Sequence, residues 1–108
     1  MIRFKNLLAS LIGLFFAISA YSWDGAQTGT VTQLDVTNGS NYGIRVFLSS
    51  GVPMCTGSTN YWGFLYSTDS NYNTYVAAIM MAKATGARLT LYLTNEGGFC
   101  HIGYVTLV

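Results

Sequence analysis

The sequence predicts a small, mainly β-sheet domain that contains one helix. Several short segments alternate apolar and polar residues, which is typical of strands with one buried face. A single segment places apolar residues at three- and four-residue spacing, which is typical of an amphipathic helix. Glycines also occur inside the strand-like segments, where the sharp coiling of a small closed sheet tolerates or requires them.

The beginning of the chain has the features of an export signal. Arg3 and Lys5 precede an apolar run, and small residues stand where a signal peptidase needs them for cleavage after Ser22. The apolar run is short for a membrane-spanning helix, and an uncleaved anchor is the alternative. We expect a bacterial Sec-type signal peptide over residues 1–22 and a single mature domain over residues 23–108. That domain is expected to have no membrane span and to be secreted or periplasmic.

Three extended segments precede the helix. Residues 30–36 alternate and are rich in β-branched side chains, which predicts a first strand. The residues expected on one face of this strand are Val31, Gln33 and Asp35. An Asn-Gly turn then leads to a second strand over residues 43–49. A third extended region covers residues 55–66, and its aromatic residues are densest near the end.

The helix is expected over residues 69–86. Asp69 or Ser70 can cap its first turn, and Gly86 can supply the left-handed residue that ends it. The residues expected to face the core are Tyr72, Tyr75, Val76, Ile79 and Met80. The opposite face carries no charge, so we expect a neighbouring subunit to cover it. The alternative is that its alanines only supply helix propensity. The interface residues expected there are Ala77, Ala78, Met81 and Ala84.

Two further strands follow the helix. Residues 88–94 alternate, with Leu89, Leu91 and Leu93 expected inward, and residues 100–108 form the last strand. The order is therefore three strands, a helix and two strands (β-β-β-α-β-β). This is the element order of an OB-fold, a small five-stranded barrel with its helix between the third and fourth strands. An open α+β sheet is the alternative that the same pattern allows.

The sequence contains two cysteines, Cys55 and Cys100. A small exported domain with two cysteines most simply forms one disulfide between them. Such a bridge would enclose the whole predicted helix and stabilise a core of limited size. A metal site built from both cysteines and His101 is the weaker alternative, because adjacent strand residues point to opposite faces and a fourth ligand is missing.

The sequence contains no convincing catalytic constellation. His101 is the only histidine, and the four carboxylates are scattered without a recognisable pair. No glycine-rich phosphate loop opens the helix. We therefore expect a non-enzyme without cofactor or metal; a small secreted hydrolase is only a remote alternative. Nucleic acid is not an expected partner, because the formal net charge is only +1 and no basic patch exists.

Aromatic and short polar side chains dominate the remaining inventory. The sequence has eight tyrosines and two tryptophans among many Asn, Ser and Thr residues. Aromatic faces stack on the apolar faces of sugar rings, and short polar side chains hydrogen-bond to sugar hydroxyls. The same composition also suits protein interfaces, so it does not select sugar over protein.

Several short motifs resemble one known family. They are Trp23-Asp24-Gly25, Thr32-Gln33-Leu34, Cys55 followed by Tyr61-Trp62-Gly63, and Thr85-Gly86 leading into Arg88-Leu89-Thr90-Leu91-Tyr92. Together they resemble the receptor-binding B subunits of subtilase cytotoxin and related pertussis-like bacterial toxins. That resemblance implies a secreted OB-fold subunit that assembles as a pentameric ring and binds cell-surface glycans. The family's extra disulfides and longer C-terminal tail are missing from this sequence.

The resemblance also suggests where a glycan would bind. The family's sugar-contacting serine falls near Gln27 or Thr28, and its sugar-contacting tyrosine falls on Leu93, next to Tyr92. With the aromatic residues added, the expected glycan-binding residues are Gln27, Thr28, Tyr42, Trp62 and Tyr92. The expected partners are further copies of the chain, a host glycan or glycoprotein, and a catalytic A subunit in a toxin complex. The alternative function is an interaction or structural protein of the bacterial envelope without sugar specificity.

Overall fold

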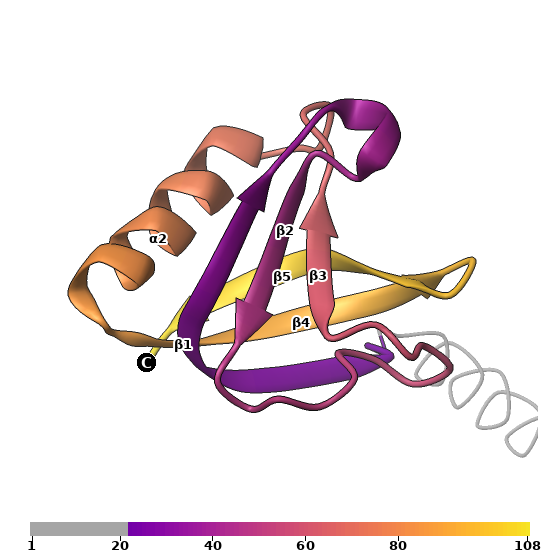
Figure 1. Cartoon of the computed structure of the whole chain (residues 1–108), viewed down its shortest axis with the longest axis horizontal. Coiled ribbons are helices and arrows are strands. Elements are labelled where there is room, and N and C mark those ends of the chain that lie inside the picture. The colour runs from indigo at the N-terminus through magenta and orange to yellow at the C-terminus, as the bar shows by residue number, and fades with distance from the viewer. Residues whose placement is uncertain (1–21) are drawn as a thin grey trace, which may run out of the picture.

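The computed structural model describes residues 22–108 and shows a mainly β-sheet domain with one α-helix (Figure 1). The elements are β1 (Gly25–Val36), a short 3-10 turn (Gly39–Asn41), β2 (Ile44–Leu48), β3 (Trp62–Leu65), α2 (Tyr72–Thr85), β4 (Arg88–Glu96) and β5 (Phe99–Leu107). Their order confirms the expected sequence of three strands, a helix and two strands. The expected signal peptide lies, apart from Ser22, outside the described residues. Among residues 22–108, no helix is both long and apolar enough to cross a membrane.

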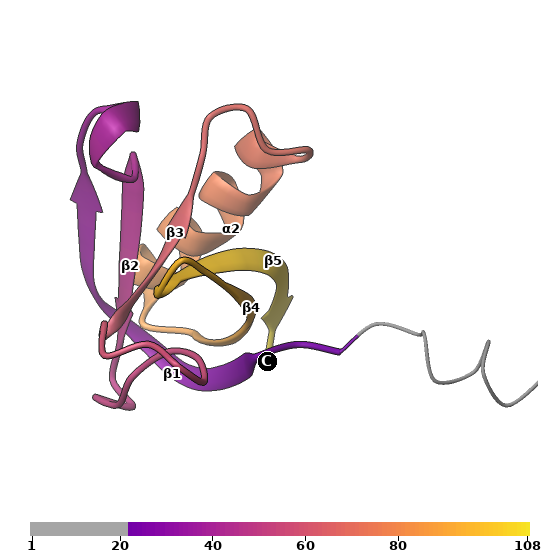
Figure 2. The same ribbon diagram turned by 90° about the vertical axis from the view of Figure 1, so that its right-hand side faces the viewer.

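The five strands form one sheet that closes on itself in the order β1-β2-β3-β5-β4. Closure is possible because β1 is long enough to pair with β2 at its end and with β4 at its beginning. β3 and β5 pair in parallel, and all other neighbouring strands are antiparallel. Figure 2 shows β1 bending under the molecule to reach both partners. The open sheet that the sequence also allowed is therefore wrong.

A β-bulge in β1 changes which side chains reach the core. The pairing with β2 shifts register between Val31 and Gln33, so one residue of β1 has no partner there. Val31 is buried, Gln33 is exposed, and Leu34 packs against the core. The expectation that Val31, Gln33 and Asp35 share a face is wrong, because the extra residue reverses the alternation after Val31.

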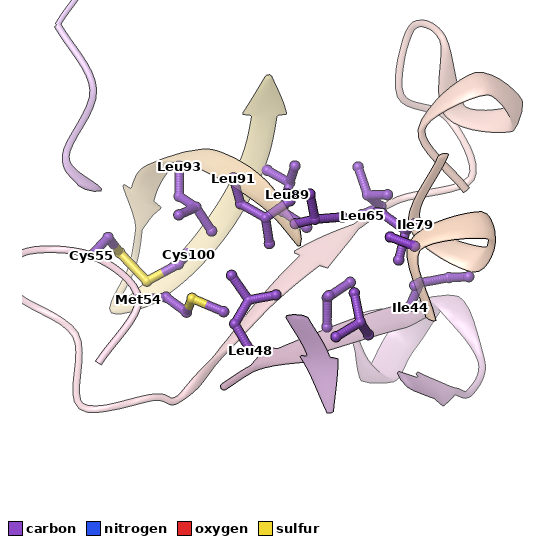
Figure 3. Packing of buried hydrophobic residues seen from close by; sticks show 14 residues of the cluster. Ile44, Leu48, Met54, Cys55, Leu65, Ile79, Leu89, Leu91, Leu93 and Cys100 are labelled. Carbon is purple, nitrogen blue, oxygen red and sulfur yellow. A yellow bond between two sulfur atoms is a disulfide. The ribbon is translucent and has the colours of Figure 1, made fainter. Parts of the chain in front are cut away.

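The core fills the inside of the closed sheet (Figure 3). Leu89, Leu91 and Leu93 are completely buried, as their alternation predicts. The third strand is shorter than expected, and the loop before it places Met54 and Cys55 in the core. Cys55 forms a disulfide with Cys100 of β5, with 5.9 Å between the Cα atoms. The predicted disulfide is thus present and joins this loop to the last strand.

Helix α2 covers the core between β1, β4 and β5 and differs from expectation at its beginning. It begins at Tyr72 after Asn71, which has a left-handed φ of 62° and makes no side-chain cap. Asp69 does not cap the helix, because its carboxylate accepts a hydrogen bond from the Tyr66 N–H at 2.8 Å. Gly86 ends the helix as predicted, with φ 72° and its N–H bonded to the Ala82 carbonyl.

The core-facing stripe of α2 also differs at its C-terminal half. Ile79 and Ala82 are completely buried, whereas Met80 is 55% exposed. The stripe continues from Ile79 by three residues to Ala82, and Met80 is rotated about 100° away from Ile79 around the helix axis. Met80 was therefore wrongly expected in the core, and it lies instead beside Met81 on the exposed surface.

Candidate functional site: an aromatic pocket on the outer face of the sheet

The site is built on neighbouring residues of β4 and β5. Tyr92 pairs with Tyr104, and Thr90 pairs with Thr106. Because successive residues of a strand point to opposite faces, these side chains lie outside while Leu89, Leu91 and Leu93 fill the core. Tyr104 is 54% exposed, and its ring meets the Tyr92 ring edge-on at a centroid distance of 5.2 Å.

Trp23 completes the site from the segment that leads into β1. The Asp24 N–H donates to the Leu93 carbonyl at 2.9 Å, and the Asp24 carboxylate accepts from the Asn95 N–H at 2.7 Å. These bonds hold the start of the domain against β4. The Trp23 ring centroid lies 5.9 Å from that of Tyr92 and 6.4 Å from that of Tyr104.

A glycine in β5 makes room for the indole. The pairing of β4 with β5 shifts register between Tyr92 and Leu93, so that Gly103 is an unpaired extra residue. A Cβ atom built on Gly103 would lie 2.6 Å from a carbon of the Trp23 ring. The Gly103 carbonyl accepts a hydrogen bond from the Tyr75 hydroxyl at 3.0 Å, which ties this position to α2. The absent side chain therefore allows the close approach of Trp23.

The three rings enclose an open pocket of about 130 Å³, lined by Trp23, Tyr92, Tyr104 and Thr106. Threonine hydroxyls extend this surface across the neighbouring strands, since the Thr28 and Thr90 side chains hydrogen-bond to each other at 2.7 Å. None of the lining residues is charged. A wall of aromatic rings with hydroxyl groups beside it can stack on a sugar ring and hydrogen-bond to its hydroxyls.

A second group of rings lies on the outer face of β3 and β5, with further rings just before β2 and just after β3, and we call it the outer aromatic cluster. It consists of Tyr42, Trp62, Phe64, Tyr66, Phe99 and His101. Its rings pack on one another: Tyr42 stacks on Phe99 at 4.4 Å, and Phe64 is completely buried. Arg45 covers the Trp62 ring from 4.6 Å above its centroid. These contacts use ring faces that a ligand would need, so packing explains this cluster.

The structure brings together three ionisable residues that the sequence left apart. The His101 Nε2 lies 2.7 Å from an Asp69 carboxylate oxygen, and its Nδ1 lies 2.5 Å from a Glu96 carboxylate oxygen. Burial alone lowers the pKa of His101, but the hydrogen bonds and charges of the two carboxylates outweigh it and raise this pKa above its ordinary value. The view that the carboxylates are scattered is wrong for Asp69 and Glu96.

The side chain of His101 contacts those of Asp69 and Glu96. Within residues 22–108, no group of three or more His, Cys, Asp and Glu side chains is arranged to hold a metal ion. Both cysteines are in the disulfide, so neither is a free thiol nucleophile. The two carboxylates occupy both ring nitrogens of His101.

The structure separates the five residues expected to bind glycan. Tyr92 lines the pocket, and Thr28 lies beside it through its bond to Thr90. Gln27 pairs with the buried Leu91, so its side chain lies on the inner face of the sheet, away from the pocket. Tyr42 and Trp62 belong to the outer aromatic cluster.

Sequence reasoning missed Trp23, Tyr104 and Thr106 as pocket residues. Alternation on either side of the Gly97-Gly98 turn is the signal that could have found Tyr104 opposite Tyr92. Using that signal required knowing that Gly103 is skipped in the pairing.

Comparisons with known proteins do not identify a family. No protein-family model matches the chain, and no curated protein matches it at a significant level. The resemblance to toxin B subunits therefore stays a prediction.

Proposed function

We propose that this chain is an exported, non-catalytic, lectin-like protein that binds a sugar of a cell-surface glycan in the Trp23–Tyr92–Tyr104 pocket. The observation that carries this proposal is the convergence of three aromatic side chains and a threonine hydroxyl on one open pocket without a charged lining residue. At about 130 Å³ the pocket is smaller than the roughly 300–1,000 Å³ of enclosed small-molecule sites. It suits one terminal sugar lying against the rings.

The fold that we propose for this function is the OB-fold. Support comes from the strand order β1-β2-β3-β5-β4, the parallel contact of β3 with β5, and the position of α2 between β3 and β4. OB-folds bind oligosaccharides and oligonucleotides through the outer surface of their strands and through their loops. The low charge of this chain favours the sugar: charged residues make up only 8% of it, and nucleic-acid binding needs clustered Lys and Arg.

We further propose assembly into a ring, with five copies if the resemblance to toxin B subunits holds. The exposed face of α2 supports this assembly, because Ala77, Met80, Met81 and Ala84 are exposed there and Ala78 is half-buried. A ring of such subunits would present several equal sugar sites and so raise the avidity for a cell surface. A catalytic A subunit would be a further partner of that ring.

The test of sugar binding is a glycan array probed with the mature domain, followed by titration of the best glycan. We expect saturable binding to a defined glycan, and we expect Tyr104→Ala to weaken it about tenfold or more, as truncation of a central aromatic contact does. Tyr61→Ala is the matched control, since Tyr61 is also 54% exposed but does not line the pocket. An empty array would refute glycan binding and favour an envelope protein without sugar specificity. Equal losses in the two variants would refute the pocket as the site.

A further inference from the structure

Asp69, His101 and Glu96 come from three different parts of the fold. Asp69 lies in the loop between β3 and α2, Glu96 is the last residue of β4, and His101 lies near the beginning of β5. Both ring nitrogens of His101 meet a carboxylate oxygen within hydrogen-bond distance. A carboxylate can only accept, and a neutral imidazole has only one N–H. Both bonds can therefore form only while His101 carries two ring protons.

Asp69 forms hydrogen bonds that fix the loop leading into α2. The Asp69 carboxylate accepts from the Tyr66 N–H, the Asp69 N–H donates to the Tyr66 carbonyl, and the Asp69 carbonyl accepts from the Tyr72 N–H. Helix α2 has no side-chain cap of its own. The contact with His101 ties this entry to β5, in addition to the bond from the Tyr75 hydroxyl to the Gly103 carbonyl.

Glu96 lies at the turn between β4 and β5, where its carboxylate contacts His101. Glu96 pairs with Phe99 across the Gly97-Gly98 turn, and its side chain is 50% exposed compared with 16% for Asp69. When His101 loses one proton, the exposed Glu96 side chain is the partner that water can replace more easily. Asp69, which is held by its backbone bonds, retains the remaining N–H.

Two aromatic rings pack against the His101 ring. Its ring stacks on Phe64 of β3 at 4.8 Å with an interplanar angle of 5°, and Tyr66 meets it edge-on at 5.5 Å. Asp69 and Glu96 are the charged groups that act on His101, and Tyr66 is the neighbouring titratable group. Burial and then the charges of Tyr42, Glu96 and Asp69 raise the pKa of Tyr66, so this phenol stays neutral while His101 titrates.

We propose that Asp69, His101 and Glu96 form a proton-controlled lock that joins the loop before α2 to the β4–β5 turn. The lock is closed when His101 is doubly protonated and bridges both carboxylates. Loss of one proton releases Glu96 and leaves the turn held only by its other contacts. The device is separate from the sugar pocket, so its test does not depend on the proposed function.

The first experiment follows the His101 ring by NMR as the pH is raised from 5 to 9. Because His101 is the only histidine, its ring signals are unambiguous in a protein made without a histidine tag. We expect it to titrate above the ordinary value of about 6.5. Glu96→Gln should lower the midpoint, because it removes one charged acceptor from an exposed position. A midpoint at or below the ordinary value, or no change in Glu96→Gln, would overturn the lock.

The second experiment measures the thermal midpoint of unfolding across the same pH range. A group whose folded-state pKa is raised stabilises the fold fully below its unfolded-state pKa and loses that contribution as the pH rises through the folded-state pKa. We expect the midpoint to fall by about 2–5 °C over this window, allowing for solvent screening. In His101→Gln this component of the pH dependence should disappear. If His101→Gln does not fold, Glu96→Gln provides the comparison, and an undiminished fall in that variant contradicts the proposal.

Discussion

Gly63 and Gly103 occupy positions where a single added carbon atom would collide with a neighbour. A Cβ atom on Gly63 would lie 2.6 Å from a methyl carbon of Leu93 and 3.0 Å from Ile102, inside the closed sheet. On Gly103 it would meet the Trp23 ring on the outer face. The first glycine thus serves the packing of the core, and the second serves the shape of the pocket.

Gly63→Ala should destabilise the fold by about 1–3 kcal/mol, because overpacking forces the buried Leu93 and Ile102 off their favoured conformations. Urea denaturation followed by circular dichroism measures this loss. Gly39→Ala is the control, since a Cβ atom there meets nothing within 4 Å, and its effect should stay within about 0.5 kcal/mol. Equal stabilities of the two variants would show that the core accepts the methyl group.

Gly103→Ala should displace the Trp23 ring and open the pocket. The indole is only half-buried, so it can move outward, and the loss of stability should be smaller than for Gly63→Ala. The chain has two tryptophans, so in a Trp62→Phe background the tryptophan emission comes from Trp23 alone. We expect a shift to longer wavelength in Gly103→Ala; an unchanged spectrum would mean that Trp23 keeps its place.

Helix α2 presents two different faces. One face contributes the buried Ile79 and Ala82 to the core, and the other exposes Met80 and Met81. Exposed methionines next to alanines form an adaptable apolar surface, and removing such a surface from water is favourable. This is the surface that a neighbouring subunit would cover in the proposed ring.

Light scattering on the domain of residues 23–108 should detect the proposed oligomer at micromolar concentration. Met81→Glu and Ala84→Glu should each dissociate it, because each places a charge on the proposed contact without touching the core. Ser50→Glu adds the same charge to the exposed loop after β2 and should leave the oligomer intact. A monomer before any substitution would refute the assembly, and an intact oligomer in both helix variants would place the interface elsewhere.

The elements show which parts of the fold could be predicted from the sequence. Alternation defined β4 and its three buried leucines, and Gly86 defined the end of α2, because each depends on neighbours along the chain. Alternation could not reveal the bulges near Thr32 and at Gly103, since an unpaired residue appears only when two strands are aligned. Met80 was misplaced because helical spacing alone does not give the centre of the buried stripe.

The same distinction applies to the candidate site. Tyr92 could be proposed from its strand and from the family resemblance, whereas Trp23 reaches the pocket only through a tertiary contact with Gly103. The group of Asp69, Glu96 and His101 was also out of reach of sequence reasoning. Asp69 meets His101 across 32 residues of sequence, and no local pattern encodes that distance.

At the scale of the whole molecule, the disulfide links the loop before β3 to β5, the last strand of the chain. Cys55 and Cys100 are 45 residues apart in sequence, and both side chains are buried. In the chain-entropy account, a bridge across a loop of this length stabilises a fold chiefly by restricting the unfolded chain. Such a contribution is large compared with the total stability of a small domain.

The Cys55→Ala, Cys100→Ala double variant should lose about 2–5 kcal/mol of stability. Urea denaturation measures this loss. The matched comparison is the original sequence whose disulfide has been reduced in the unfolded state, and we expect the same decrease in its free energy of unfolding. Mild reductant applied to the folded protein should leave the bridge intact, because Cys100 is completely buried and Cys55 nearly so. Equal urea midpoints of the double variant and the oxidised protein would contradict this account.

The position of β5 between β3 and β4 in the closed sheet affects how the chain folds. β5 pairs with β4 along its length and with β3 through Gly63 and Phe64, so it is the strand that closes the sheet. Until β5 docks, β3 and β4 present unpaired backbone groups, which are templates for association with other chains. A newly synthesised chain that has not yet placed its last strand is therefore the form most exposed to aggregation. The Cys55–Cys100 bond covalently fastens the strand that removes both open edges.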